Sequence, residues 1–238
     1  VVTPATGHRD LPRCCASVMA QTYPSIDYYV VVDGAERAAT AAEGIRAVRD
    51  WPATSMVVLP HRTGSGGYNG HRIYGAFSFL VPGDVVVFLD EDNWIEPDHV
   101  ESLVRLIADE GLDWAHSLRR IWSKDGDLVC EDDCQSLGRW PVYHDPSLHH
   151  VDLNCYALTR KAAMALAHVV AQPYGGAFTT SSDHLLCQAL LKQFPRFATT
   201  GLSTVNYVAG GSVPPEYFLI GNEQMRARYP DGMPWRKR

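Results

Sequence analysis

The chain has 238 residues, the composition of an ordinary globular protein, and a formal net charge of −6 at pH 7. Its scattered lysine and arginine residues argue against broad non-specific binding to nucleic acid or anionic membranes. Its apolar runs are shorter than the roughly 20 residues that a membrane-spanning helix needs. We therefore expect a cytoplasmic protein with no transmembrane segment, whose six cysteines are reduced.

The first half of the chain predicts alternating strands and helices. Apolar strands are expected at residues 1–3, 28–32, 56–59 and 85–89. Helices are expected at residues 11–21, at residues 69–80, and from Pro97 to a terminating Gly111. Continuous apolar strands separated by helices are typical of a mainly parallel sheet covered on both faces. Ligands of such sheets bind at the carboxyl ends of the strands.

The second half predicts a mixed arrangement. Strands are expected at residues 112–122, 128–130, 151–158 and 204–208, the first two forming a hairpin. Helices are expected from a Thr159 cap to about residue 170, from a Ser181 or Ser182 cap to about residue 194, and over residues 216–229. No internal repeat or low-complexity linker divides the chain, so we expect a single domain over residues 1–238.

The most informative stretch is VVVFLDEDNWIEPDH, in which a purely apolar strand ends in Asp90, Glu91 and Asp92. Three carboxylates crowded where a buried strand reaches the surface repel one another. A divalent cation that carries a diphosphate compensates such charge well. The alternative is a solvated turn, but Glu91 between the two aspartates would then add repulsion without any gain. The pattern therefore favours a metal and phosphate site.

Several motifs in order carry a family resemblance. The opening VVTPATGHRDLPRCCASVMAQTYPSIDYYVVVDGA resembles the start of the family 2 glycosyltransferases, with its Thr-Pro, loop arginine, Gln-Thr-Tyr-Pro and strand ending in Asp33. Residues 69–72, the acidic strand end and the triplet at residues 182–184 resemble later motifs of that family. The resemblance is best over residues 1–105 and thins to isolated points afterwards.

The resemblance implies an α/β architecture, the GT-A fold. This is a Rossmann-like, mostly parallel central sheet flanked by helices, with a smaller mixed or antiparallel portion on the acceptor side. Residues 1–110 would form the nucleotide-sugar-binding half and residues 111–238 the acceptor-side half. The implied activity is a metal-dependent, inverting transfer of a sugar from a nucleoside diphosphate donor, with a UDP-sugar favoured. The hydroxyl acceptor stays open among a glycan, a lipid-linked sugar, a protein, a small molecule and a modified nucleobase.

The resemblance also implies roles for acidic residues. Asp92 would be a direct ligand of Mn²⁺ or Mg²⁺, and Asp90 would approach the ribose or bind the ion through water. Asp33 would accept hydrogen bonds from the nucleobase, and Asp183 would be the catalytic base. His150 or His184 would complete the metal shell, unless water does so.

The remaining donor-side residues are chosen on the same grounds, and they are Thr3, Pro4, Arg9, Arg62, Asn69, Arg72 and Glu91. The first two would line the base pocket through their backbone. The three arginines would face the phosphates, because a guanidinium offers fixed paired donors.

Two other functions compete with glycosyl transfer. A sugar-nucleotide nucleotidyltransferase shares the strand order and the metal chemistry, but its Gly-rich opening loop is missing after Val2. A catalytically silent sugar- or nucleotide-binding domain is the other alternative. In that case Asp183 would be a helix-start carboxylate that accepts hydrogen bonds from backbone N–H groups.

Overall fold

A computed structural model describes residues 1–48, 55–173, 182–210 and 213–236. Its first sheet is parallel, with strands in the order β1 (Val2–Ala5), β2 (Tyr29–Val32) and β3 (Ser55–Val58). An isolated parallel bridge pairs Val2 of β1 with Phe88, the residue that follows β4 (Val85–Val87) of the larger sheet. The predicted parallel first half is confirmed.

The larger sheet is mixed, and it runs in the order β4, β10, β6, β11, β5, with β7 paired to β6. Its strands are β4 (Val85–Val87), β5 (Trp94–Ile95), β6 (Trp114–Trp122), β7 (Leu128–Glu131), β10 (Tyr156–Thr159) and β11 (Phe197–Val208). Only the β6–β11 pair is parallel. A separate hairpin pairs β8 (Pro141–Val142) with β9 (Asp145–His149).

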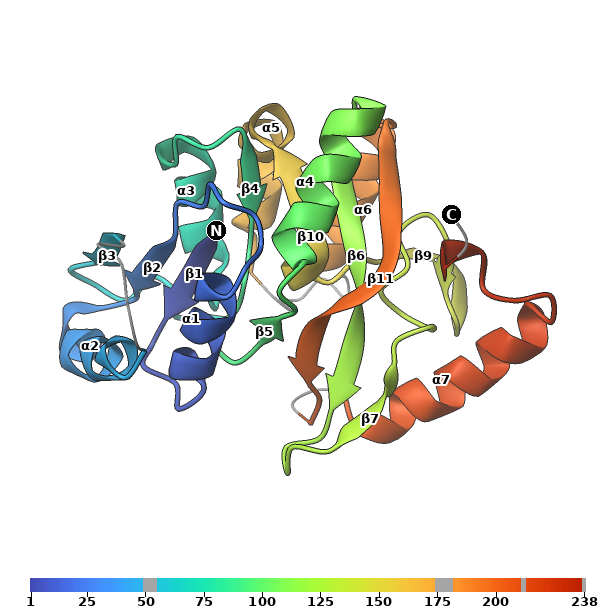
Figure 1. Cartoon of the computed structure of the whole chain (residues 1–238), viewed down its shortest axis with the longest axis horizontal. Coiled ribbons are helices and arrows are strands. Elements are labelled where there is room, and N and C mark those ends of the chain that lie inside the picture. Colours follow the sequence, from blue (N-terminus) through green and yellow to red (C-terminus); the bar gives the residue numbers. More distant parts are fainter. Residues whose placement is uncertain (49–54, 174–181, 211–212, 237–238) are drawn as a thin grey trace.

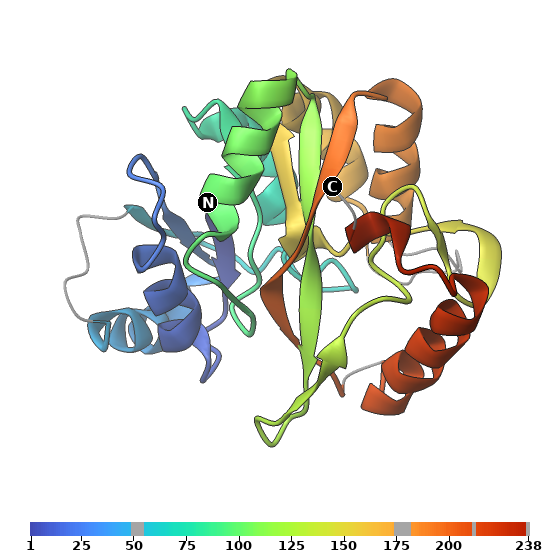
Figure 2. The same ribbon diagram turned by 45° about the vertical axis from the view of Figure 1, so that its right-hand side comes forward.

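Helices cover both faces of the sheets. They are α1 (Leu11–Met19), α2 (Ala38–Arg46), α3 (His71–Leu80), α4 (His99–Glu110), α5 (Arg160–Val170), α6 (Ser182–Gln193) and α7 (Pro215–Arg228). In Figures 1 and 2, α4 lies on one face of the larger sheet, α5 and α6 lie on the other, and α7 lies beside β7 at the edge. Short 3-10 turns are η1 (Ala35–Arg37), η2 (Leu153–Cys155) and η3 (Pro234–Arg236).

Two predicted helix boundaries are confirmed by their chemistry. Gly111 ends α4 in the left-handed conformation at φ 61°, which costs glycine no Cβ clash. The Thr159 hydroxyl accepts a hydrogen bond from the Ala162 N–H and begins α5. For α6, Ser182 is the first helical residue, and Ser181 lies outside the described residues.

Other expectations about the elements were wrong. The strand expected from residue 151 begins only at Tyr156, because the Asp152 carboxylate accepts the Asn154 N–H and turns residues 153–155 into a 3-10 helix. Strand β11 starts at Phe197, seven residues before its expected start at Thr204. Helix α2 was missed because it buries only Ala41 and Ile45, too few to give an apolar period.

The described core has a main part between helices and sheets, a small cluster between α4 and the larger sheet, and another small cluster under α7. The cluster under α7 consists of Leu118, Ile121, Cys134, Leu137, Ala209, Phe218, Met225 and Trp235. All six cysteines are unpaired thiols, as expected, and five are buried. Among the described helices, none has both the length and the apolar character that crossing a membrane requires.

Close packing of α3 on α5 gives a first test of the fold. A Cβ added at Gly75 would lie 2.7 Å from the Ala167 carbonyl oxygen and 2.8 Å from the Ala171 Cβ, so the helices must separate. Gly75→Ala is expected to lower the free energy of unfolding by about 1–3 kcal/mol, measured by urea denaturation.

Gly44→Ala in α2 is the matched control. The same added Cβ there meets ordinary contacts of 3.6 Å or more, so the better helix propensity of alanine should leave stability equal or up to about 1 kcal/mol higher. Equal effects of the two substitutions would contradict the observed α3–α5 packing.

Candidate active site

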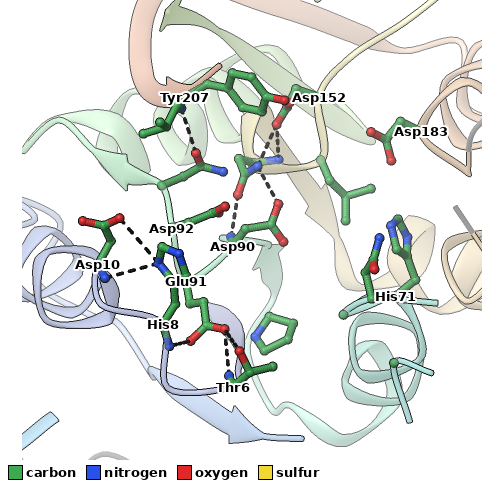
Figure 3. Close-up of a pocket in the computed structure, with 18 of the residues that line it drawn as sticks. Thr6, His8, Asp10, His71, Asp90, Glu91, Asp92, Asp152, Asp183 and Tyr207 are labelled. Carbon is green, nitrogen blue, oxygen red and sulfur yellow. Dashed lines mark hydrogen bonds and ion pairs between the residues drawn. The ribbon is translucent and has the colours of Figure 1, made fainter. Parts of the chain in front are cut away.

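A cleft of about 820 Å³ opens where the carboxyl ends of β1, β2 and β4 meet the second half of the chain. Most of the residues selected from the sequence line it: Pro4, Arg9, Asp33, Arg62, Asn69, Asp90, Glu91, Asp92, His150, Asp183 and His184. In Figure 3, Thr6, His8 and Glu91 lie on one side, with Asp183 on the other. The structure therefore brings residues 150 positions apart and more into one site.

Two expected residues do not line this cleft. Thr3 is fully buried, and its Oγ1 accepts a hydrogen bond of 3.2 Å from the Tyr28 hydroxyl. The Arg72 guanidinium lies 3.4 Å from the centre of the Tyr68 ring and donates to the Thr63 carbonyl. Helix α3 turns Arg72 toward this loop and away from the cleft.

Asp33 lines the cleft, but its carboxylate holds a loop. It accepts hydrogen bonds from the Thr63 N–H at 2.6 Å, the Thr63 hydroxyl at 2.8 Å and the Gly64 N–H at 2.9 Å. Asn69, at φ 47°, closes that loop by donating its N–H to the Gly64 carbonyl. The end of β2 therefore shapes the glycine-rich loop after β3.

Glu91 holds a second loop, the one between β1 and α1. Its two carboxylate oxygens accept hydrogen bonds from the N–H groups of Thr6, Gly7 and His8 at 2.8, 3.1 and 2.9 Å, and from the Thr6 hydroxyl at 2.6 Å (Figure 3). The repulsion expected from Glu91 is therefore offset by four donors. The same loop brings His8 and Arg9 to the cleft.

Asp90 is held from both sides. The Tyr74 hydroxyl donates to its Oδ1 at 2.6 Å, and the Asn154 amide donates to its Oδ2 at 3.0 Å while accepting the Asp90 N–H at 2.6 Å. Burial is the main cause that raises the pKa of Asp90, the charge of Asp92 adds to it, and the two hydrogen bonds oppose it, with a net pKa of about 7. Asp90 is thus a fixed carboxylate that binds a proton unusually well.

Asp92 differs from its neighbours, because it accepts no hydrogen bond from another described residue and is exposed to the cleft. The surrounding protein removes part of its water and raises its pKa, an effect that the charge of His8 opposes. A carboxylate crowded by other acids and lacking a donor is the kind of oxygen ligand that divalent cations prefer. Asp92, with Asp90 behind it, therefore fits a metal ion.

His150 and His184, the histidines expected to complete the metal shell unless water does so, both line the cleft. Within the described ranges, no group of three or more His, Cys, Asp or Glu side chains is arranged to hold a metal ion. His150 and His184 instead lie against each other, 4.7 Å between ring centres, beside Asp183. Oxygens of a bound ligand or water would have to complete the shell around Asp92.

Asp183 lies in the first turn of α6, on the far side of the cleft from Glu91. Its Oδ2 lies 3.7 Å from His150 Nε2. Burial by itself raises the pKa of Asp183, but the hydrogen bond and charge of His150, together with His71 and His184, outweigh it and leave this pKa below its ordinary value. Asp183 is therefore ionised at neutral pH and able to accept a proton.

Sequence reasoning missed the residues that connect these acids. Arg119 is buried and pairs with the carboxylates of Asp132, at 2.8 Å, and Asp152. Asp152 in turn accepts a hydrogen bond of 2.8 Å from the Asn154 amide that binds Asp90. One signal was available in the sequence, because His150, Asp152 and Asn154 alternate with apolar residues, which is the two-residue period of extended chain.

Comparison with known proteins identifies the family. The sequence profile described as Glycosyl transferase family 2 matches residues 1–129, and the chain belongs to this family. The chain is 31% identical to Glycosyltransferase GlyA of Streptococcus pneumoniae serotype 4 over 105 residues. This matched stretch makes up 44% of this chain and 14% of that protein. Over 88 residues the chain is 39% identical to the Glucosyl-dolichyl phosphate glucuronosyltransferase of Haloferax volcanii, 37% of this chain and 26% of that protein. The chain thus matches only a minor part of these longer relatives.

Solved structures agree on the fold. S. aureus TarS 1-349 in complex with UDP-GlcNAc superimposes with a TM-score of 0.60 at 13% identity, over 95% of this chain and 64% of that one. TarS 1-349 in complex with UDP gives a TM-score of 0.59 over 95% and 63%. At this identity the likeness establishes the architecture, and the expected GT-A fold is confirmed.

The role of Glu91 can be tested without any ligand. Glu91→Gln replaces one acceptor oxygen with an NH₂ group that faces backbone N–H donors, so the β1–α1 loop should loosen. We expect the amide hydrogens of Thr6, Gly7 and His8 to exchange at least tenfold faster, measured by hydrogen–deuterium exchange.

Glu101→Gln provides the control, because Glu101 lies on α4 and pairs with the exposed Arg105 outside the cleft. Exchange in the β1–α1 loop should be the same in this variant as in the native chain. Unchanged exchange in Glu91→Gln would show that the loop holds its shape without this carboxylate.

Proposed function

We propose that this chain transfers a sugar from a nucleoside diphosphate donor, preferably a UDP-sugar, to a hydroxyl acceptor with inversion at the anomeric carbon. One observation carries the proposal: a single cleft holds Asp92, a carboxylate open to a ligand, and across from it Asp183, a carboxylate kept ionised by histidines. The family membership supports it. So do the TarS structures, of which one binds UDP-GlcNAc and another UDP.

In this proposal the first half of the chain binds the donor. The loops held by Asp33 and Glu91 would enclose the nucleoside, with Pro4 and Asn69 lining the pocket. Arg9 and Arg62 would face the diphosphate, and Lys124 from the β6–β7 turn lines the same cleft and would add a third cation. Residues 1–110 would act as the donor half of one domain and residues 111–238 as its acceptor half.

Asp92, supported by Asp90, would hold a Mn²⁺ or Mg²⁺ ion. Such an ion, when bound, neutralises negative charge that develops on the departing diphosphate. Asp183 and Leu153, which line the cleft from the second half of the chain, would meet the sugar and acceptor.

Transfer with inversion needs one base. As the acceptor oxygen attacks the anomeric carbon, the bond from that carbon to the phosphate oxygen breaks, and the hydroxyl proton passes to the Asp183 carboxylate. A carboxylate of low pKa can take this proton because the hydroxyl becomes acidic as its oxygen bonds to carbon. His150, whose Nε2 lies 3.7 Å from the carboxylate, would favour the reactive, ionised form of Asp183.

Substitution of the two open carboxylates tests this division of roles. Asp183→Asn should reduce turnover of the donor by about 10²–10⁴-fold, because the base is lost, while UDP affinity in Mn²⁺ stays within about threefold. Asp92→Asn should instead weaken Mn²⁺-dependent UDP binding by at least tenfold. Turnover is measured as UDP release from a panel of UDP-sugars, and affinity by calorimetry.

Asp109→Asn on the exposed face of α4 is the control and should alter neither quantity. UDP-sugar turnover that survives both Asp92→Asn and chelation would remove the metal from the proposal. Tight UDP binding without any turnover, with candidate acceptors present, would favour the non-catalytic binding domain. Release of pyrophosphate from UTP and a sugar phosphate would favour the nucleotidyltransferase.

The raised pKa of Asp90 predicts a pH dependence of donor binding. The metal ion favours ionised carboxylates, and Asp90 takes up a proton near its pKa of about 7. The affinity for the donor should therefore be highest well above pH 7 and should decrease as the pH falls through this value. We expect Mn²⁺-dependent affinity for the best-bound UDP-sugar to fall by up to about tenfold from pH 8 to pH 6. The diphosphate diester of a UDP-sugar does not titrate in this range, and a flat profile would contradict the assignment.

A further inference from the structure

One short segment, residues 150–154, touches both ends of the cleft. His150, Asp152 and Asn154 each line it, and they are 5%, 5% and 1% exposed. Val151 and Leu153 alternate with them and are buried apolar residues. The segment therefore presents three polar side chains and Leu153 to the site, while fully buried Val151 anchors it in the core.

The Asn154 end of the segment holds Asp90. Its amide group both donates to the Asp90 carboxylate, at 3.0 Å, and accepts the Asp90 N–H, at 2.6 Å (Figure 3). A two-point contact of this kind fixes the backbone and the side chain of Asp90 together. It also leaves Asp90 little freedom to turn toward Asp92.

The His150 end of the segment holds Asp183. His150 Nε2 lies 3.7 Å from Asp183 Oδ2, whereas Nδ1 is buried and has no hydrogen-bond partner in the part of the chain that the structure describes. The imidazole is therefore oriented by Asp183 and by packing against His184. No other role in the proposed reaction uses this ring.

The middle of the segment is fixed to the second half of the chain. The Asp152 carboxylate pairs with buried Arg119, and the Asp152 N–H donates to the Ser136 hydroxyl at 2.9 Å. The N–H groups of Leu137 and Gly138 both donate to the His150 carbonyl, at 2.9 and 3.0 Å. A buried pair with this many supporting hydrogen bonds is a rigid attachment point.

We propose that residues 150–154 form a strut that sets the spacing between the donor-site carboxylate and the catalytic base, with Asn154 positioning Asp90 and His150 positioning Asp183. The inference rests on the proposed function, in which Asp183 is the base. It gives His150 a role different from metal binding. It also makes the acceptor half of the chain a determinant of the donor site.

Two substitutions separate the ends of the strut. His150→Ala should lower the kcat of UDP-sugar hydrolysis by about tenfold to a hundredfold with the Kd for UDP and Mn²⁺ within twofold of native. His150→Gln should recover part of the loss, because its amide can donate to Asp183. Asn154→Asp, which is isosteric but sets a carboxylate against Asp90, should weaken UDP binding in Mn²⁺ by at least tenfold.

A double-mutant cycle shows whether His150 acts through Asp183. If it does, His150→Ala should cause no further loss of kcat in the Asp183→Asn background. His168→Gln is the control for loss of a histidine, because the His168 side chain is exposed on α5, and this variant should behave as the native chain does. Melting temperatures identify any variant that fails to fold. If His150→Ala does not fold, His150→Gln is used in its place to test the His150 end of the strut.

Three results would overturn the strut. They are full additivity in the cycle, equal loss of UDP affinity in the His150 and Asn154 variants, and native behaviour of both. A different result, native turnover in Asp183→Asn itself, would refute the base assignment of the proposed function. The Asn154→Asp measurement of UDP affinity would still test the donor end of the strut in that case.

Discussion

The site is governed by one constraint: acidic side chains crowd the carboxyl ends of the strands, and each needs a hydrogen-bond donor or a cation. Asp33 and Glu91 obtain donors from the N–H groups of neighbouring loops, and Asp90 obtains them from Tyr74 and Asn154. Asp92 has none among the described residues. The distribution of donors thus separates carboxylates that shape the cleft from the one available to a ligand, although all are alike in sequence.

A buried charge network ties this acidic edge to the second half of the chain. Arg119 must be paired, because an uncompensated charge in the core costs several kcal/mol. Its partners Asp132 and Asp152 hold the turn at residues 133–136 and, through Asn154, the carboxylate of Asp90. The family profile ends at residue 129, so most of this network lies in the part of the chain that the profile does not describe.

Three histidines, His71, His150 and His184, lie near Asp183. His150 is the main neighbour that lowers the pKa of Asp183, whereas burial lowers the pKa of His184 itself to about 4 and leaves that ring uncharged at neutral pH. The two curated relatives match over only 105 and 88 residues. The histidines beside Asp183 are among the rings that the sequence predicted as further metal ligands.

The sequence alone determined most strands and helices of the first half, α2 and β5 excepted, together with the acidic strand end and the candidate base, because hydrophobic period, caps and short motifs act within a few residues. It could not assign partners. Glu91 binds a loop 85 positions away, Asp90 an amide 64 positions away, and His150 a carboxylate on another helix. Such pairings depend on how the sheets and helices pack, so only the tertiary structure decided which carboxylates are held and which stay open.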